Sequence, residues 1–411
     1  MHILFLTDNF PPEVNAPASR TFEHCREWVR QGHKVTVVTT APNFPKGEVF
    51  DGYRNRLWQW ETVEGIRVLR VWTYITANAG FLKRTLDYLS FMVTGFLTAL
   101  FVRRIDVVTG TSPQFFTNCA AWLLSAIRRR PFVFELRDLW PESIKTVGAM
   151  EDNWVIRLLE RLELFLYRRA DVVVAVTHSF RCNLIERGID PNKIHVVTNG
   201  VDLSRFHPMA RDGELPRSLG LEGVFVAGYI GTHGMAHSLE TLLDAAGELQ
   251  ARKNDPVASQ IRLVLLGDGA CKAALKDKAA ELDLRNVVFL DTVPKDEVPR
   301  YWSLLDVSII HLRRDPNFTQ VIPSKLFECM AMGIPVLHGV EGESADIVER
   351  DAVGQTFEPE NADALVEGLL SLARDSDRYD RYRAACLEAA PKYDRRRLAN
   401  DMLEVIEAVA R

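Results

Sequence analysis

Cysteine is scarce in this chain, and its few cysteines show no pairing pattern. Only six occur among 411 residues, each standing alone, without a Cys-x-x-Cys spacing or a histidine cluster. Thiols scattered in this way are typical of small buried apolar residues in a reducing compartment. The pattern therefore argues against a disulfide framework or a zinc site. The positions are Cys25, Cys119, Cys182, Cys271, Cys329 and Cys386.

Other signatures are missing as well. The histidines are dispersed and no Asp-x-Asp pair follows a predicted strand, so we expect neither a metal nor a resident cofactor. No basic stripe is interleaved with aromatic residues, which argues against nucleic acid as a partner. The opening MHILFL reads as a strand, without the basic and apolar regions of a secretory signal, and we expect a cytoplasmic protein.

The composition is that of an ordinary soluble protein, but the charge is unevenly distributed. Hydrophobic residues make up 47% and charged residues 26%, so the disordered and fibrous classes are excluded. Residues 1–200 hold 25 Lys and Arg against 20 Asp and Glu, whereas residues 201–411 hold 25 against 35. The positively charged half suggests contact with an anionic surface or ligand. The alternative is that these charges are only solvated and that their uneven distribution arose by chance.

Short apolar, β-branched runs alternate with helical segments along most of the chain, a pattern typical of parallel strands connected by helices. The pattern begins again after Asn199-Gly200, so we predict an α/β protein with two doubly wound domains. The expected strands are Ile3–Leu6, Val35–Thr39, Ile66–Val71, Val107–Thr109, Phe132–Phe134, Val172–Val176, Ile194–Val197, Val224–Ile230, Ile261–Leu266, Val287–Leu290, Val307–Ile310 and Pro335–Leu337.

The domain boundary should lie near residues 202–223, where Gly, Pro and charged residues gather without a helical or strand period. We place the first domain at 1–203 and the second at 204–390. A C-terminal helix within 391–411, about Arg395–Ala410, could pack back on the first domain. Two such sheets facing each other would form a cleft at the carboxyl ends of their strands.

One segment is almost wholly apolar. Leu86–Val102 is bracketed by Lys83-Arg84 and Arg103-Arg104, and at 17 residues it is short for a membrane span of about 20. A buried helix is one interpretation, and a helix partly immersed in a membrane face with basic flanks is the other. Arg128-Arg129-Arg130 could join such a surface or cap a helix.

The strongest local signal is PSKLFECMAMGIPVL at residues 323–337. Pro323 and Ser324 are typical of a helix start, and Gly333 of a helix end. A carboxylate at Glu328 could accept hydrogen bonds from two vicinal hydroxyls of a ribose, and Lys325 could meet a phosphate. Helix periodicity alone leaves both as surface residues.

In its order of motifs the chain resembles the GT-B glycosyltransferases of family four, which retain the donor's anomeric configuration, and among them amino-sugar transferases of bacterial surface polysaccharides. The resemblance covers nearly the whole chain and implies an acceptor-binding first domain and a second domain that binds a nucleotide sugar. The segments that carry it are TDNFPPEVNAPASR, RQGHKVTVVT, DVVTGTSP, RDLWPE, TNGVDLSRF, GYIGTHG, LLGDG, VPKDEVPRYWSLLDVSI, PSKLFECMAMGIPVL and GESADIV.

The resemblance implies roles for individual residues of the second domain. Glu328 matches the second Glu of the family signature, and Gln320 stands where the first would be, which removes a charge beside the transferred sugar. The usual Arg and Lys of the diphosphate site are absent, so we assign that charge to Lys325 and treat Lys325 and Glu328 as candidate catalytic residues. The remaining donor contacts are expected at Gly231, Thr232, Gly267, Gly269, Pro323, Ser324, Gly342, Glu343, Ser344 and Ala345, the last four through a helix N-terminus suited to phosphate.

In the first domain, the predicted acceptor contacts are Asn15, Ser19, Arg20 and Asp138, which follow predicted strands. Asp138 is also a candidate catalytic residue, although such loop residues can equally cap local turns. The resemblance implies transfer of a sugar, an N-acetylated amino sugar or deoxy sugar, from UDP to a saccharide in O-antigen or capsule synthesis. The expected acceptor is linked to a polyprenyl diphosphate at the inner face of the cytoplasmic membrane.

Two other functions are left open. A non-hydrolysing nucleotide-sugar epimerase shares the two-domain architecture, although the order of motifs argues against it. A nucleotide-sugar-binding partner protein without turnover is suggested by Gln320 and the missing Arg and Lys.

Overall fold

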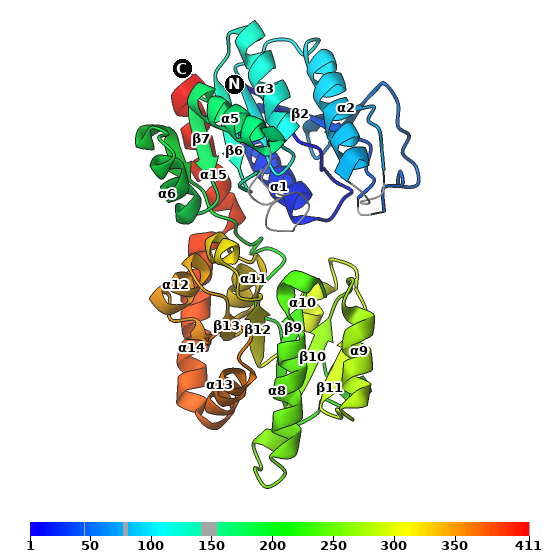
Figure 1. Ribbon diagram of the computed structural model, residues 1–411, viewed down its shortest axis with the longest axis vertical. Helices are drawn as coiled ribbons and strands as arrows, with labels where there is room; N and C mark the ends of the chain where they lie inside the picture. Colours follow the sequence, from blue (N-terminus) through cyan, green and yellow to red (C-terminus); the bar gives the residue numbers. More distant parts are fainter. Residues whose placement is uncertain (45, 77–80, 141–153, 411) are drawn as a thin grey trace. The chain divides into compact units, whose positions relative to one another are not determined.

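The computed structural model describes residues 1–44, 46–76, 81–140 and 154–410, and its contacts divide the chain into two compact units (Figure 1). The first unit comprises Met1–Asn199 with Arg395–Arg411, and the second comprises Gly200–Asp394. The chain thus enters the second unit at residue 200, where 204 was expected, and leaves it after 394, where 390 was expected.

The first unit is built on an eight-stranded sheet in the order β3-β4-β2-β1-β5-β6-β7-β8. All neighbouring strands are parallel except β3 and β4, which are antiparallel. The central strands are buried, as expected for a parallel sheet covered by helices. The bounds are β1 His2–Leu6, β2 Lys34–Thr40, β3 Trp58–Val63, β4 Ile66–Val71, β5 Val107–Thr111, β6 Phe132–Leu136, β7 Val172–Ala175 and β8 Ile194–Val196.

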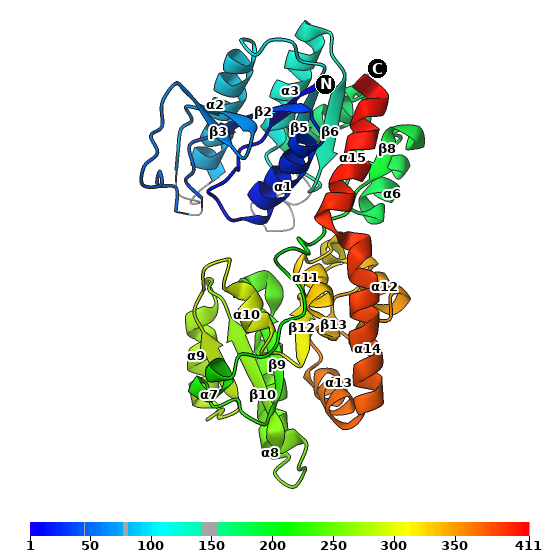
Figure 2. The same ribbon diagram turned by 180° about the vertical axis from the view of Figure 1, so that it is seen from behind.

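Helices cover this sheet, and one of them comes from the far end of the chain. In α15 the backbone carbonyl of Ala399 accepts a 2.8 Å hydrogen bond from the indole of Trp28 in α1, and Figure 2 shows the two helices side by side. Arg395 forms an ion pair with Glu23 of α1. The bounds are α1 Ala16–Arg30, α2 Phe81–Ala99, α3 Phe115–Arg128, α5 Trp154–Arg169, α6 His178–Glu186, η1 Pro191–Lys193 and α15 Arg395–Ala410.

The second unit has a six-stranded sheet in the order β11-β10-β9-β12-β13-β14, parallel throughout. Its strands are β9 Phe225–Ile230, β10 Ile261–Leu266, β11 Val287–Leu290, β12 Val307–His311, β13 Val336–Gly339 and β14 Gly354–Thr356. Its helices are α7 Glu214–Ser218, η2 Met235–His237, α8 Glu240–Ala251, η3 Ala258–Gln260, α9 Lys272–Glu281, α10 Val298–Trp302, η4 Pro316–Gln320, α11 Lys325–Met332, α12 Glu343–Arg350, α13 Ala362–Arg374, α14 Ser376–Ala389 and η5 Ala390–Tyr393.

The twelve strands expected from the sequence are present, with small differences at their ends. Two further strands, β3 and β14, were not expected. In β3 the exposed residues alternate with half-buried ones along an edge that pairs only with β4, so no apolar run marks the strand. β14 is three residues long and pairs with β13 only, too short for a periodic signal.

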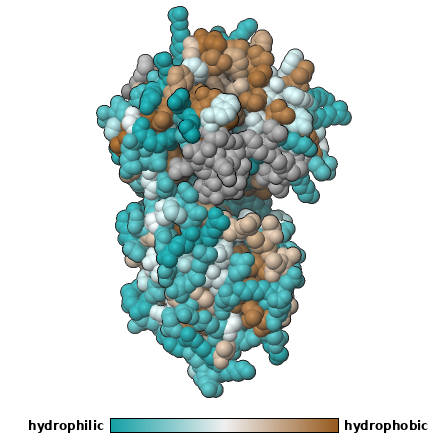
Figure 3. Space-filling view, viewed as in Figure 1, coloured by the Kyte–Doolittle hydropathy of each residue, from teal (hydrophilic) through white to brown (hydrophobic). Residues whose placement is uncertain are grey.

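The apolar segment 86–102, for which the sequence left a buried helix and a membrane-facing helix open, lies mostly in α2, which has one buried face and one exposed apolar face. Phe91 is fully buried against the sheet, whereas Leu86, Val93 and Leu97 are 54%, 49% and 50% exposed. Apolar side chains also gather over this part of the first unit in Figure 3, where Figure 1 draws α2 and α3. None of the described helices is both long and apolar enough to cross a membrane.

Candidate functional site

The predicted donor residues of the second unit meet at one edge of its sheet. Because all its strands are parallel, the loops after β9, β10, β12 and β13 emerge at the same, carboxyl edge, where such sheets bind ligands. Gly231 and Thr232 follow β9, Gly267 and Gly269 follow β10, the 320–328 segment follows β12, and residues 342–345 follow β13. The structure therefore brings all four groups of predicted residues to one edge.

The glycines after β9 and β10 allow two loops to lie against each other. A Cβ on Gly267 would lie 1.8 Å from the carbonyl oxygen of Gly231, and one on Gly269 would lie 2.5 Å from that of His233. Gly231 and Gly267 also have φ values of +148° and +145°, which side chains rarely allow. The backbone amide of His233 donates to the carbonyl of Asp268 at 2.9 Å. The amides of Gly231 and Gly267 also donate to backbone carbonyls, those of Leu266 and Leu290, so these glycines shape the loops.

Lys325 begins α11, and its ammonium lies beside Tyr229, near the end of β9, and Gly231, which begins the next loop. Its Nζ is 3.7 Å from the ring centroid of Tyr229, and a Cβ on Gly231 would lie 2.6 Å from it. No ion pair formed within the described residues includes Lys325. Burial lowers the pKa of Lys325 to about 7, although the charge of Glu328 works in the opposite direction.

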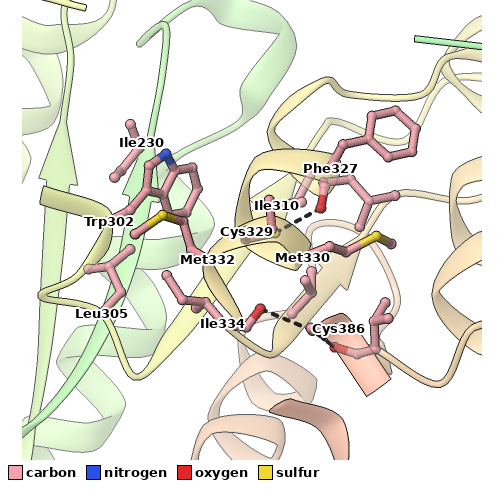
Figure 4. Close-up of a cluster of buried hydrophobic side chains, with 14 of the residues drawn as sticks. Ile230, Trp302, Leu305, Ile310, Phe327, Cys329, Met330, Met332, Ile334 and Cys386 are labelled. Atoms are coloured by element: carbon pink, nitrogen blue, oxygen red, sulfur yellow. Dashed lines mark hydrogen bonds between the residues drawn. The ribbon is translucent and has the colours of Figure 1, made fainter. Parts of the chain in front are cut away.

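Glu328 stands three residues after Lys325, on the same face of α11. Its Oε2 accepts a 3.3 Å hydrogen bond from the indole Nε1 of Trp302 in α10. The opposite face of the helix is buried, and Figure 4 shows Cys329 and Met330 of α11 among neighbouring apolar side chains. That packing holds both charged residues at the edge of the sheet. The wider cluster includes Ile230, Trp302, Leu305, Ile310, Phe327, Met332, Ile334 and Cys386.

Two side chains at this edge of the sheet, His233 and the half-buried Gln320, have buried polar atoms without hydrogen-bond partners in the described part of the chain. Both ring nitrogens of the fully buried His233 are unpaired within the described structure, and so is Oε1 of Gln320. Burial lowers the pKa of His233 to about 4, so this ring is neutral at pH 7. Buried polar atoms without a partner are costly, and a polar ligand at this edge could supply the missing bonds.

Sequence reasoning missed a set of histidines because they are far apart in the chain. His311 ends β12, and its Nδ1 donates to the carbonyl of His237 at 2.8 Å, while its Nε2 accepts from the amide of Glu360 at 2.9 Å. In β13, Nε2 of His338 lies 2.8 Å from Oγ of Ser344. Their position at or near the carboxyl ends of strands was the available signal. The described residues contain no group of three or more His, Cys, Asp or Glu that could hold a metal.

The helix start at 342–345 differs from the expectation in one respect. The amide of Ala345 already donates to the carbonyl of Gly342 at 2.9 Å, so the prediction that it offers a free donor is wrong. Ser344 is fully buried, with its hydroxyl beside His338. Gly342 has a φ of +85°, and a Cβ on it would lie 2.1 Å from the carbonyl oxygen of Thr319.

In the first unit, Arg20 is not available to an acceptor. It is 3% exposed, its Nε donates to Oε1 of Glu135 at 2.8 Å, and its two Nη atoms donate to the carbonyls of Val197 and Thr198. Burial favours the neutral form of Glu135, but Arg20 and Arg137 outweigh it and hold its pKa below the usual value. The predicted contact at Arg20 is therefore corrected to a structural ion pair, because the side chain turns inward from α1.

The other acceptor candidates have mixed positions. Asn15 caps α1 by accepting from the amide of Ala18 at 2.9 Å, and it also lines a cavity of 280 Å³. Ser19 is buried and does not line this cavity. Asp138 follows β6, where its amide donates to Oγ of Ser112 at 3.2 Å, and it does not line the cavity either.

The cavity brings together amides, hydroxyls, carboxylates and aromatic rings. Three carboxylates lie in it, those of Asp8, Glu13 and Asp87. Burial, followed by the charge of Asp8, raises the pKa of Asp87 to about 7, and Arg84 works in the opposite direction. The side chain of Arg84 donates to the hydroxyl of Tyr88 at 2.6 Å. Such a lining suits a ligand rich in hydroxyl groups. The lining residues are Asp8, Asn9, Glu13, Asn15, Pro17, Thr40, Asn43, Phe44, Gly47, Thr76, Arg84, Asp87, Tyr88, Pro113 and Gln114.

Two family descriptions match the chain. A "Glycosyl transferase 4-like domain" matches residues 15–200, and "Glycosyl transferases group 1" matches residues 213–392. A protein of Escherichia coli whose name assigns it to colanic acid biosynthesis as the glycosyl transferase WcaI is 26% identical over 382 residues. That alignment covers 90% of this chain and 91% of the relative.

Solved structures share the fold over the whole length. Sucrose-phosphate synthase from Thermosynechococcus elongatus has a TM-score of 0.79 at 15% identity, covering 99% of this chain and 98% of that one. HepE from Anabaena, solved in complex with UDP, has a TM-score of 0.71 at 17% identity, covering 99% of this chain and 100% of that one. At these identities the likeness concerns the fold alone, which is GT-B.

Proposed function

We propose that this chain, which belongs to the family-4-like glycosyltransferases of the GT-B fold, transfers a sugar from a UDP donor to a saccharide during surface polysaccharide synthesis. The sugar is an N-acetylated amino sugar or a deoxy sugar, the anomeric configuration is retained, and no metal takes part. The acceptor is a saccharide carried on a polyprenyl diphosphate in O-antigen or capsule synthesis.

The observation that carries the proposal is the position of Lys325. An ammonium without an ion-pair partner in the described structure lies at the carboxyl edge of the sheet, beside a glycine that leaves space for it. A diphosphate placed there would pair with this cation. Glu328, on the same helix face, can accept hydrogen bonds from the ribose hydroxyls. Gln320 offers a neutral amide near the sugar, whereas the Glu usual at this position in the family would be negatively charged.

The chemistry required of these groups is electrostatic. As the bond between sugar and diphosphate breaks, negative charge grows on the leaving oxygen, and a preorganised cation stabilises it. The acceptor hydroxyl attacks from the face that the diphosphate leaves, and its proton passes to the departing diphosphate. Protein groups therefore orient the two substrates and neutralise charge.

We place the saccharide acceptor in the cavity of the first unit, because its amide, carboxylate and aromatic lining suits hydroxyl groups and sugar rings. The exposed apolar residues of α2 and the adjacent basic pairs support contact with the inner face of the cytoplasmic membrane. A lipid-linked acceptor would then be presented where the enzyme is bound.

The test is incubation of purified full-length protein with radiolabelled UDP-sugars, alone and with lipid-linked saccharides, and with GDP-sugars as the competing donor class. Transfer that requires the acceptor supports the proposal. Interconversion of the UDP-sugar without acceptor would indicate an epimerase, and saturable binding without either reaction would indicate a binding partner. Transfer from GDP-sugars alone would overturn the donor assignment.

A further inference from the structure

The phenol ring of Tyr229 lies against the ammonium of Lys325. Tyr229 is fully buried in β9, and its hydroxyl donates to the carbonyl of Thr232 at 2.8 Å, which fixes the ring. Nζ of Lys325 lies 3.7 Å from the centroid of that ring. The face of an aromatic ring carries negative electrostatic potential, so it favours the charged form of an amine over the neutral one.

Gly231 keeps this contact open. A Cβ there would lie 2.6 Å from Nζ and 3.6 Å from the Tyr229 hydroxyl oxygen, so any side chain would displace the ammonium from the ring. The ammonium is thus confined by a ring on one element and a glycine on the following loop. Such a position limits the rotamers of a long, flexible side chain.

Few other charges face this ammonium. Glu328 is on the same helix, and the neighbouring Cys329 is neutral at pH 7 because burial raises the pKa of its thiol. His233 and His237 face it from the loop after β9, and burial lowers the pKa of each to about 4, so both are neutral at pH 7. The ring of Tyr229 and the carboxylate of Glu328 are therefore the groups that oppose the effect of burial.

We propose that Tyr229 is a positioning residue, whose ring keeps Lys325 protonated and directed to the place that the diphosphate of the nucleotide sugar takes. The proposal rests on the donor role of Lys325 proposed above. Tyr229 itself does not touch the substrate; it acts through the charge and the direction of Lys325. Loss of the ring should remove the charge from a fraction of the free enzyme at neutral pH.

The first test needs no donor. The full-length protein is labelled with [¹³Cε]-lysine, the Lys325 signal is assigned by its absence in Lys325→Met, and its pKa is measured in the wild type, Tyr229→Phe and Tyr229→Leu. We expect Phe to leave the pKa unchanged and Leu to lower it by about one unit. Equal values in all three proteins would overturn the proposal.

A substitution by Leu could instead disturb the fold, and a second series avoids this. Phenylalanine analogues with one, two and three fluorine atoms at position 229 keep the ring's shape while reducing the negative potential of its face. We expect the pKa of Lys325 to fall stepwise with fluorination. A pKa that stays constant through the series means that the ring acts by shape alone, which contradicts the proposal.

Kinetics supply the readout tied to function. A lowered pKa means that Lys325 is charged below about pH 7 and loses its proton as the pH rises, so kcat/KM for the donor should decline on the alkaline side. Tyr229→Leu should move this decline to lower pH and reduce kcat/KM at pH 7.5 about tenfold, with kcat less affected because the bound diphosphate restores the charge. Tyr229→Phe should match the wild type.

The two readouts separate two kinds of failure. If no UDP-sugar is bound or used by the wild type, the donor assignment fails, while the titration of Lys325 still decides whether the ring holds its charge. If the wild type turns over and all the Tyr229 variants share its pH profile and its Lys325 pKa, the inference on Tyr229 is wrong.

Discussion

The indole of Trp302 donates to a carboxylate oxygen of Glu328 across 3.3 Å, joining α10 to α11 at the carboxyl edge of the second sheet. Trp302 is fully buried, so its ring cannot follow a moving carboxylate. The contact therefore fixes the direction of Glu328 before any ligand is bound. A hydrogen bond to a charged acceptor contributes about 1.5–3 kcal/mol, enough to hold one rotamer.

The first prediction concerns Glu328 as the ribose ligand. Glu328→Ala should leave the fold intact and weaken donor binding by about 1.5–3 kcal/mol, because the ribose hydroxyls lose a charged acceptor. Isothermal titration with UDP measures the change. Glu328→Gln, which keeps the shape and one acceptor oxygen, should lie between Ala and the wild type. An unchanged affinity for UDP in Glu328→Ala would contradict the ribose assignment.

The second prediction concerns Lys325 as the cation at the leaving group. Lys325→Ala should lower kcat at saturating donor by at least about 10²-fold, comparable with losing one donor to a developing oxyanion. Lys325→Arg keeps a charge but cannot place its planar group in the space between Tyr229 and Gly231, so it should recover only part of the rate. Near-native turnover in Lys325→Ala would show that the start of α12 is sufficient.

A third prediction separates the structural role of Arg20 from any role in catalysis. Arg20→Met removes the direct ion-pair partner of the buried Glu135, and should reduce the free energy of unfolding by about 3–5 kcal/mol. Arg30→Met, an exposed residue of the same helix, is the matched control and should change it little. Chemical denaturation measures both, and an Arg20→Met protein as stable as the wild type would contradict the structural role of the ion pair.

The same pair predicts how stability depends on pH. Because the pKa of Glu135 is held below its usual value of 4.5, its contribution to stability is complete above pH 4.5 and is lost as the pH falls through the lower, folded-state pKa. The wild type should therefore lose stability below about pH 4.5, and Arg20→Met should lose less over that range. Parallel denaturation curves at pH 7 and pH 4 make the comparison.

The sequence was informative about the sheets because buried parallel strands are continuous apolar runs, such as Ile261–Leu266, whose predicted bounds agree with the structure. It could not reveal β3, because an exposed edge strand needs no such run. The parallel topology predicted that Gly231, Gly267 and Lys325 lie at the same edge of the sheet. It did not predict the distances between them.

Side-chain direction was the part that the sequence could not supply. Arg20 and Asn15 both belong to the start of α1, yet one turns inward to Glu135 while the other lines the cavity. A pattern of residue types does not distinguish these two directions. The ring of Tyr229 was unnoticed for a related reason, since its partner is 96 residues away in the chain.

The last prediction is binding of the first unit to anionic membranes through α2. Leu86→Glu with Leu97→Glu places charge on two half-exposed residues without touching the buried Phe91, and should abolish co-sedimentation with vesicles rich in anionic lipid. Leu282→Glu, at a residue of the second unit that is 46% exposed, should leave it unchanged. Raising the salt from about 0.1 M to 1 M shortens the screening length from about 10 Å to about 3 Å, and should release the wild type if the basic residues beside α2 assist binding. Equal recovery of the wild type in the supernatant with anionic and with neutral lipid would mean that this apolar surface serves another purpose.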